Sequence, residues 1–216
     1  MALEAESLRY GTPKIARLAR YVPPSVLFAR MSTQRQEVAI TFDDGPHPEY
    51  TPRILDALQE AKVHATFFVV GKNARRYPKL IRRIVDEDHR LGCHTETHVD
   101  LSRVGVRQAW QECRQSQMFL EQVSGQRIRI LRPPWGRIQA STILIALCCK
   151  MRLAFWNVDS LDHRGITTQE MVLRLKNTNI KSGDILLFHD DCENTVLAQS
   201  QILEYVRSRD LAFSIL

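Results

Sequence analysis

Two adjacent carboxylates, Asp43 and Asp44, directly follow a β-branched and apolar stretch of chain, Glu37 to Phe42. That stretch has the composition of a strand that is covered on both faces. The Gly45-Pro46 pair that comes next predicts a turn, so both carboxylates should project from the end of the strand. Two like charges at such a place are costly unless a cation compensates or one carboxyl stays protonated. The pair therefore indicates a cation site, with a simple polar turn as the alternative.

Two histidines four residues apart, His94 and His98, are a second set of candidate ligands. This spacing puts both rings on one face of a helical turn, where they can converge on one ion. Imidazole nitrogens bind zinc and its first-row neighbours. Two histidines and one aspartate make three protein ligands, which leaves an open coordination position for water and substrate, as a hydrolytic metal site needs.

The elements that must position these side chains alternate between strand and helix from residue 37 onward, which predicts parallel strands joined by right-handed crossovers. Strands are expected at Glu37–Phe42, Ala65–Val70, Arg90–Cys93, Arg127–Leu131, Leu153–Val158, Asp184–Phe188 and Leu211–Ile215. Helices are expected between them, beginning near Thr51-Pro52, Tyr77-Pro78, Gly105, Gln139, Thr168 and Thr195.

The chemistry-bearing residues all follow the ends of predicted strands. The carboxyl ends of the strands are the active face of a (β/α) barrel, where closure brings such residues together. An open doubly wound sheet would instead string them along one edge. We therefore expect an α/β fold, an incomplete or distorted (β/α) barrel of about seven parallel strands with the site at the carboxyl ends of the strands. The residues concerned are Asp43, Asp44, His94, Arg132 to Gly136, Asp159, Asp162, His189 and Asp190.

Length and composition fit one ordinary globular domain. The chain has 216 residues, 44% hydrophobic and 25% charged, which suits a single α/β domain at residues 37–216 preceded by an N-terminal arm at residues 1–36. The five cysteines are an odd number with neither zinc-ribbon nor disulfide-framework spacing, so free thiols are expected. No signal peptide or transmembrane stretch is visible, which predicts a cytoplasmic, or else membrane-proximal, location.

A net charge of +6 invites an anionic partner, but the basic residues are dispersed. No aromatic-interleaved basic stripe is visible, so we expect no nucleic-acid partner. The N-terminal arm mixes arginines with apolar residues between positions 14 and 30. Packing of this arm on the domain is expected, with contact to a membrane surface as the alternative.

Five ordered motifs make residues 37–216 resemble the NodB-type polysaccharide deacetylases. The fourth motif departs from the family at His163, where tryptophan is usual. Histidine is smaller and ionisable near neutrality, which bears on substrate fit and pH profile but removes no catalytic group. The motifs are TFDDG at Thr41–Gly45, H-[ST]-x-x-H at His94–His98, R-x-P-[YW]-G at Arg132–Gly136, D-x-x-D-W as Asp159–His163, and L-x-H at Leu187–His189.

The resemblance implies a metal-dependent hydrolase that removes N-acetyl groups from an N-acetylated glycan and releases acetate. Asp44, His94 and His98 would hold one divalent metal, usually zinc in this family, with cobalt and nickel also accepted. Asp43 would be the general base and Arg132 would tether it.

The resemblance also assigns the remaining site residues. His189 would be the general acid held by Asp162, and the backbone N–H of Trp135 would stabilise the oxyanion. Leu187 would line the pocket for the acetyl methyl, and Pro134, Trp135 and His163 would complete the substrate-binding set.

Other functions remain open from the sequence. The main one is a barrel that keeps the metal and binds a glycan without turning it over. A metal phosphoesterase commonly uses two metals bridged by carboxylates. A glycosidase needs its carboxylates about 5 Å or more apart, which adjacent aspartates fit poorly. Chitooligosaccharide, peptidoglycan, an exopolysaccharide precursor and a lipid-linked sugar are the candidate substrates.

Overall fold

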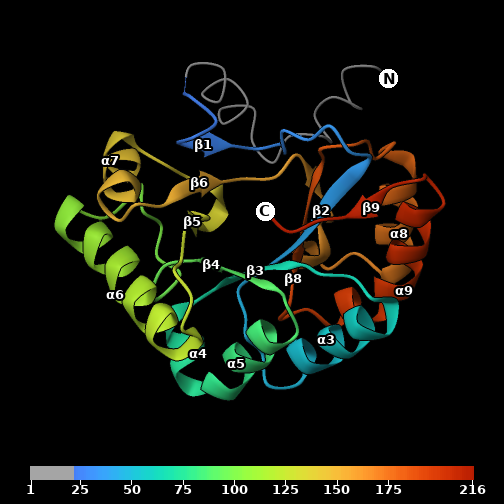
Figure 1. Cartoon of the computed structure of the whole chain (residues 1–216), viewed down its shortest axis with the longest axis horizontal. Coiled ribbons are helices and arrows are strands. Elements are labelled where there is room, and N and C mark those ends of the chain that lie inside the picture. The colour runs from blue at the N-terminus through green and yellow to red at the C-terminus, as the bar shows by residue number, and fades with distance from the viewer. Residues whose placement is uncertain (1–21) are drawn as a thin grey trace.

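A computed structural model describes residues 22–216 as a curled parallel sheet with helices around its outside (Figure 1). The strands are β1 (Leu27–Phe28), β2 (Glu37–Asp43), β3 (Thr66–Val69), β4 (Arg90–Cys93), β5 (Ile130–Leu131), β6 (Arg152–Ala154), β7 (Val158–Asp159), β8 (Ile185–His189) and β9 (Ala212–Phe213). The helices are α3 (Tyr50–Ala61), α4 (Gly71–Arg76), α5 (Pro78–Asp86), α6 (Val106–Ser124), α7 (Ala140–Cys148), α8 (Thr168–Asn177) and α9 (Glu193–Arg207). Two short 3₁₀ turns are η1 (Pro134–Gly136) and η2 (Asp162–Arg164).

The strand order shows how the sheet closes. It runs β1-β6-β5-β4-β3-β2-β8-β7, with β9 paired to β2, and every pairing in the described part of the chain is parallel. Strands β6 and β7 lie near opposite ends of this order, yet only residues 155–157 separate them in the chain. The sheet therefore curls until its ends meet, and the predicted incomplete (β/α) barrel is confirmed.

The single strand predicted at Leu153–Val158 is wrong, because this stretch divides into β6 beside β5 and β7 beside β8. The guanidinium of Arg132 explains the division. Its Nε donates to the carbonyl of Ala154 and its Nη2 to that of Phe155, each at 3.2 Å. These two carbonyls are bonded to a side chain instead of to a neighbouring strand, so the ladder stops and the chain bends.

The part of the predicted N-terminal arm that the structure describes packs on the domain. Strand β1 pairs with β6, and its residues Leu27 and Phe28 are buried. A two-residue strand is too short to give a periodic signal, which is why the sequence did not predict it. The predicted contact of the arm with a membrane surface falls largely on residues 1–21, which lie outside the described residues.

The predicted helices are confirmed, with shifts of one or two residues at most ends. Helix α6 ends at Ser124 and is followed by Gly125, which lies in the left-handed region at φ 69°. Helix α3 begins one residue before the predicted cap at Thr51, whose hydroxyl instead donates to Asp190. Helix α4 was not predicted, because six residues carry too little periodicity.

The core lies between the sheet and these helices and includes aromatic rings on the face of the sheet opposite to Thr41 and Asp43. The rings of Phe42 and Phe67 have centroids 5.0 Å apart, and Phe188 lies 6.0 Å from Phe42. Among residues 22–216, no helix combines the length and the apolar character that crossing a membrane requires. The cytoplasmic location stays a prediction.

Candidate active site

The predicted site residues come together because each follows the carboxyl end of a strand. Asp43 is the last residue of β2 and pairs in register with His189, the last residue of β8. His94 follows β4, and Arg132 follows β5 on the neighbouring strand. Asp162 opens the short turn η2 just beyond β7. Parallel strands in a curled sheet place all these side chains at one rim.

Asp44, His94 and His98 converge at the centre of this rim. Oδ1 of Asp44 lies 3.3 Å from Nε2 of His94 and 3.0 Å from Nε2 of His98. The Nδ1 of His94 lies 2.7 Å from the carbonyl oxygen of Arg132, so Nδ1 donates there and Nε2 is left with its lone pair facing Asp44. Burial alone would raise the pKa of Asp44, but the two neighbouring histidines, in their charged forms, hold it well below its usual range.

These three side chains fit a divalent metal. Among residues 22–216, two groups of three or more His, Cys, Asp or Glu side chains have ligand atoms that all lie within 4.8 Å of one another, and these three residues form one of them. Oδ1 of Asp44 is buried and has no hydrogen-bond donor of good geometry among the described residues. The separations of 3.0 and 3.3 Å match the edge, about 3.3 Å, of a tetrahedron with bonds of about 2 Å. Two imidazoles and a carboxylate are ligands that zinc and its neighbours accept.

The helical turn predicted for His94 to His98 is wrong, because this stretch is an irregular loop. Thr95 and His98 have positive φ angles, 66° and 59°, which an α-helix does not allow. Glu112 holds the loop: its Oε2 accepts from the backbone N–H of Glu96 at 3.0 Å and of Thr97 at 2.7 Å. The histidines therefore converge through loop geometry and not through helical spacing.

Arg132 connects the strand ends to each other. Its side chain is fully buried, and Nη1 donates to Oδ1 of Asp43 at 2.7 Å and to the hydroxyl of Thr41 at 2.8 Å. The second oxygen of Asp43, Oδ2, lies 3.8 Å from Nε2 of His94. Asp43 therefore has one oxygen bound by the guanidinium and the other directed towards the three convergent side chains.

His189 is bound to Asp162 on the other side of the site. Nδ1 of His189 lies 2.7 Å from Oδ1 of Asp162, while Nε2 lies 4.0 Å from Oδ2 of Asp44. Burial alone would lower the pKa of His189, but the hydrogen bond and the charge of Asp162 outweigh it and raise this pKa to about 10. Oδ2 of Asp162 accepts from the backbone N–H of His189 at 2.7 Å and from the hydroxyl of Thr195 at 2.5 Å.

The residues predicted to bind substrate surround this centre. Trp135 is half exposed, and its ring lies 4.4 Å from the ring of His98. Leu187 is buried two residues before His189 on β8, so both side chains leave the same face of the strand. His163 lies beside the His189–Asp162 pair, with its ring 4.9 Å from that of His189. Pro134 is buried at the start of η1.

Three supporting residues, Thr195, Glu112 and Thr51, were not predicted to take part in the site, and Asp190 was expected at the rim without a role. Asp190 is buried behind the first motif, where the hydroxyl of Thr51 donates to its Oδ2 at 2.5 Å. A Cβ at Gly45 would lie 2.0 Å from this carboxylate, which explains why the aspartate pair is followed by glycine. Burial, and then the charge of Asp191, raise the pKa of Asp190 to about 7. Its place directly after His189 was the one available signal.

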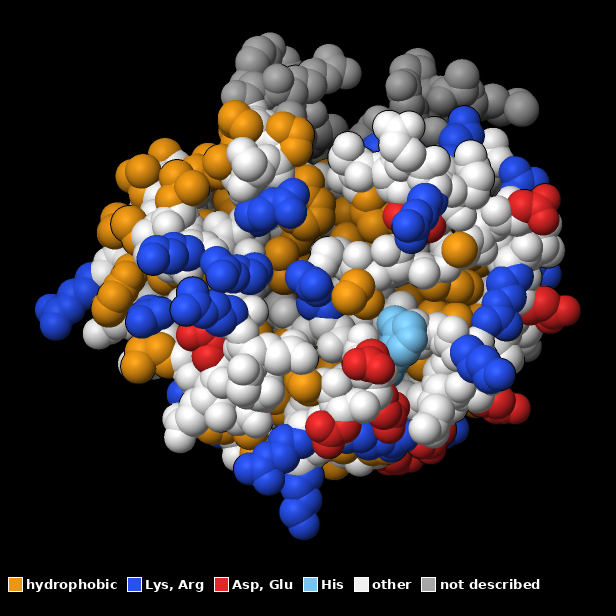
Figure 2. All heavy atoms as spheres, viewed as in Figure 1, with side chains coloured by type: hydrophobic (Ala, Val, Ile, Leu, Met, Phe, Trp, Pro, Cys, Tyr) orange, Lys and Arg blue, Asp and Glu red, His pale blue; other side chains and the backbone are white. Residues whose placement is uncertain are grey.

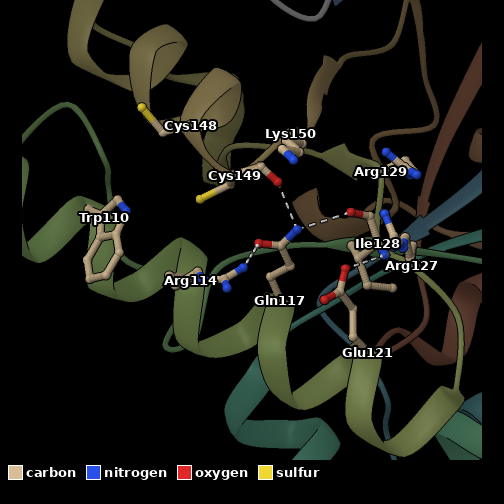
Figure 3. A pocket seen from close by; sticks show the side chains of 10 residues that line it. All are labelled: Trp110, Arg114, Gln117, Glu121, Arg127, Ile128, Arg129, Cys148, Cys149 and Lys150. Atoms are coloured by element: carbon tan, nitrogen blue, oxygen red, sulfur yellow. Dashed lines mark hydrogen bonds between the residues drawn. The ribbon is translucent and has the colours of Figure 1, made fainter.

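A cavity of about 450 Å³ lies between α6, α7 and the chain segments that precede β5 and β6 (Figure 3). It is lined by none of the predicted site residues. Gln117 crosses its floor, donating to the carbonyls of Ile128 and Cys149 and accepting from Arg114. On the face shown in Figure 2, Lys and Arg side chains gather on the side of α6 and β6. Because this cavity is lined by residues that precede their strands, it lies away from the carboxyl-end rim.

Comparison with known proteins gives the family. The model of the family described as "Polysaccharide deacetylase" matches residues 30–154, which include the convergent aspartates and histidines and Arg132. This chain belongs to the polysaccharide deacetylase family. The resemblance inferred from the five motifs is thereby confirmed.

Individual relatives agree with this assignment. The chain is 30% identical over 183 residues to a peptidoglycan-N-acetylglucosamine deacetylase of Bacillus cereus, covering 83% of this chain and 66% of the relative. It is 35% identical over 177 residues to a chitooligosaccharide deacetylase of Sinorhizobium fredii, covering 79% and 80%. The solved structure of the peptidoglycan deacetylase PdaC from Bacillus subtilis superposes with a TM-score of 0.79 at 32% identity, covering 85% of this chain and 89% of that one.

Proposed function

We propose that this protein is a metal-dependent hydrolase that removes N-acetyl groups from N-acetylglucosamine-containing glycans and releases acetate. The observation that carries the proposal is the meeting of three groups at the rim. Asp43, which is paired with Arg132, lies 3.8 Å from His94, and His189, which is paired with Asp162, lies 4.0 Å from Asp44. A candidate base, a metal-ligand set and a candidate acid are the parts that amide hydrolysis needs.

Asp44, His94 and His98 would hold the ion, through Oδ1 and the two Nε2 atoms. Zn²⁺ is the first choice for this donor set, and Co²⁺ or Ni²⁺ are alternatives. When bound, the ion supplies a Lewis acid for the acetyl carbonyl and lowers the pKa of water to about 7. With three protein ligands, the ion retains a position for water and substrate.

Asp43 accepts the proton of the attacking water at Oδ2. Arg132 makes this possible, since it binds Oδ1 at 2.7 Å and leaves Oδ2 available. It also fixes the direction of Oδ2, because a carboxylate held at one oxygen cannot rotate freely.

His189 donates a proton to the departing amine from Nε2, the ring nitrogen that does not face Asp162. The amine is a poor leaving group until it is protonated, and a pKa raised to about 10 keeps this imidazole protonated near neutrality. Asp162 orients the ring, and Thr195 in turn orients Asp162. Base and acid would then act from the neighbouring strands β2 and β8, where Asp43 and His189 pair in register.

The substrate-binding roles follow the same geometry. The backbone N–H of Trp135 would stabilise the oxyanion, and Leu187 would line the pocket for the acetyl methyl. Pro134 and His163 would complete the walls of the pocket. The relatives are named for peptidoglycan and for chitooligosaccharide, and both materials contain N-acetylglucosamine. We propose this sugar unit as the feature that the site recognises.

The decisive experiment measures acetate release from N-acetylchitooligosaccharides by chelator-stripped protein, with and without added Zn²⁺ or Co²⁺. Metal-restored release is the expected result. Asp43→Asn should retain the ion held by Asp44, His94 and His98 and lose activity at least a hundredfold. Metal binding without acetate release from any N-acetylated glycan would instead support the alternative, a non-catalytic glycan-binding barrel.

A further inference from the structure

His163 adds a third candidate metal ligand to the pair formed by His189 and Asp162. Nδ1 of His163 lies 3.7 Å from Oδ1 of Asp162, and Nδ1 of His189 lies 2.7 Å from the same oxygen. Ligand atoms of these three residues all lie within 4.8 Å of one another, which makes them the second of the two such groups among residues 22–216. None of these residues belongs to the set Asp44, His94 and His98.

We propose that Asp162, His163 and His189 form a second zinc site, which inhibits the enzyme when it is filled. The donor set repeats that of the first site, two imidazoles and one carboxylate. The atoms need only small movements, since the separations of 2.7 and 3.7 Å lie on either side of the tetrahedral edge of about 3.3 Å.

The surroundings of Asp162 support a metal site. Its side chain is fully buried, and its Oδ2 is held by the hydroxyl of Thr195 and by the backbone N–H of His189. Oδ1 accepts from the backbone N–H of His163 at 2.9 Å and faces the Nδ1 atoms of both histidines, so it is the oxygen that an ion would take. The bonds to Oδ2 keep the carboxylate in place, as supporting contacts do around known metal ligands. His163 is 40% exposed, so its ring can rotate towards the ion and the site is open to solvent.

The site depends on the residue at position 163. The family pattern that the chain resembles has tryptophan here, and an indole offers no metal-ligand atom. With tryptophan, only Asp162 and His189 would remain, and two ligands do not make a stable zinc site. The proposal is therefore specific to chains that carry histidine at this position.

Inhibition follows from the role of His189 and rests on the proposed function. An ion bound at Nδ1 of His189 replaces the proton that this nitrogen shares with Asp162. The Nδ1 proton leaves to solvent and the ring loses its orienting bond. The Nε2 proton stays, but its transfer to the amine would leave an imidazolate in place of a neutral imidazole, so the ring becomes a much weaker acid. Loss of a general acid lowers turnover by roughly a hundredfold or more.

The test is a zinc titration of metal-free protein, with bound ions counted after buffer exchange. Wild-type protein should bind two Zn²⁺ per chain, and both His163→Trp and His163→Gln should bind one. His94→Ala should also bind one, through the second site alone. His64→Gln is the matched control, since His64 is an exposed histidine outside both sites, and it should bind two. One ion in wild type, or two in both His163 variants, would overturn the proposal.

Acetate release during the same titration tests the inhibition. Wild-type activity should rise with the first equivalent and fall with the second. The activity of each His163 variant, relative to its own maximum, should stay level. Two bound ions without a fall in activity would overturn the inhibitory part. If no condition gives acetate, the proposed function fails, while the ion count still decides whether the site exists.

Discussion

The guanidinium of Arg132 and the carboxylate of Asp43 form an ion pair at 2.7 Å in which neither side chain is more than 4% exposed. The pair connects β5 to β2 from inside the barrel, although 89 residues separate the partners in sequence. Burial lowers the pKa of Arg132, and the charge of Asp43 opposes that shift. The pair is thus part of the core as well as of the site.

Arg132→Met should therefore lower the free energy of unfolding of the protein, independently of any effect on activity. The substitution leaves the carboxylate of Asp43 buried without its partner, which costs about 3–5 kcal/mol. Urea unfolding of the metal-free protein measures the loss. Arg75→Met is the control: Arg75 pairs with Glu96 at 2.8 Å but is 45% exposed, so its loss should stay below about 1 kcal/mol. Equal effects of the two substitutions would contradict the structural role of Arg132.

Gly45→Ala tests the close packing behind the aspartate pair. The new Cβ would lie 2.0 Å from Oδ2 of Asp190, so strand β2 or the carboxylate must move. We expect a loss of about 2–3 kcal/mol in unfolding free energy. Gly105→Ala is the control, because a Cβ there meets no atom within 4 Å. Asp190→Ala should relieve part of the Gly45→Ala penalty, and purely additive effects would show that the two sites do not interact.

Glu112→Gln tests how the loop that carries His98 is held. Glutamine retains the shape of the side chain but has one acceptor oxygen in place of two, whereas Glu112 receives three hydrogen bonds from Glu96 and Thr97. Metal affinity should fall about tenfold, as for other residues that orient ligands. Glu121→Gln on the same helix is the matched control, since Glu121 accepts from Ile128 away from the site. Isothermal titration with Zn²⁺ should show no change for that control.

His89, which is not part of the candidate active site, should make the free energy of unfolding depend on pH. Its Nδ1 accepts from the backbone N–H of Ala65 at 3.1 Å, so the folded ring is neutral. Burial, and then the charges of His64 and Arg83, lower the pKa of His89 from 6.5 to about 4. Between these two values the unfolded chain binds a proton that the folded chain does not, so stability is present above pH 6.5 and is lost as pH falls towards 4.

The variant His89→Gln isolates this contribution. The carboxylates titrate in both proteins, so the difference between their pH dependences reports on His89. Wild type should lose about 3 kcal/mol more than the variant between pH 7 and pH 4. Urea unfolding at a series of pH values measures it, and parallel curves for the two proteins would contradict the prediction.

The sequence predicts the site better than it predicts the supporting structure. Asp43, Asp44, His94 and Arg132 each stand directly after a strand, so local patterns were enough to place them at one rim. Contacts between distant elements left no local signal. Thr195, for example, lies 33 residues from Asp162 on the face of a helix, where nothing in its neighbours marks it.

Two errors share one physical cause, a long-range side chain that overrides a local preference. The stretch from Leu153 to Val158 reads as one strand, but the guanidinium of Arg132 takes two of its neighbouring carbonyls and bends it. The spacing of His94 and His98 reads as a helical turn, but Glu112 binds the backbone N–H groups of the loop between them. Neither partner lies close enough in sequence to be recognised in advance.

The bend at residues 155–157 has a consequence for how such a chain can change over generations. The side chain that bonds the carbonyls at this bend is also the one that orients the proposed base. A descendant that no longer needed the chemistry could replace His98 or His189 freely, but it would still need Arg132 to close its barrel. Arg132 should therefore be among the last of these residues to vary, and its presence alone is poor proof of an active enzyme.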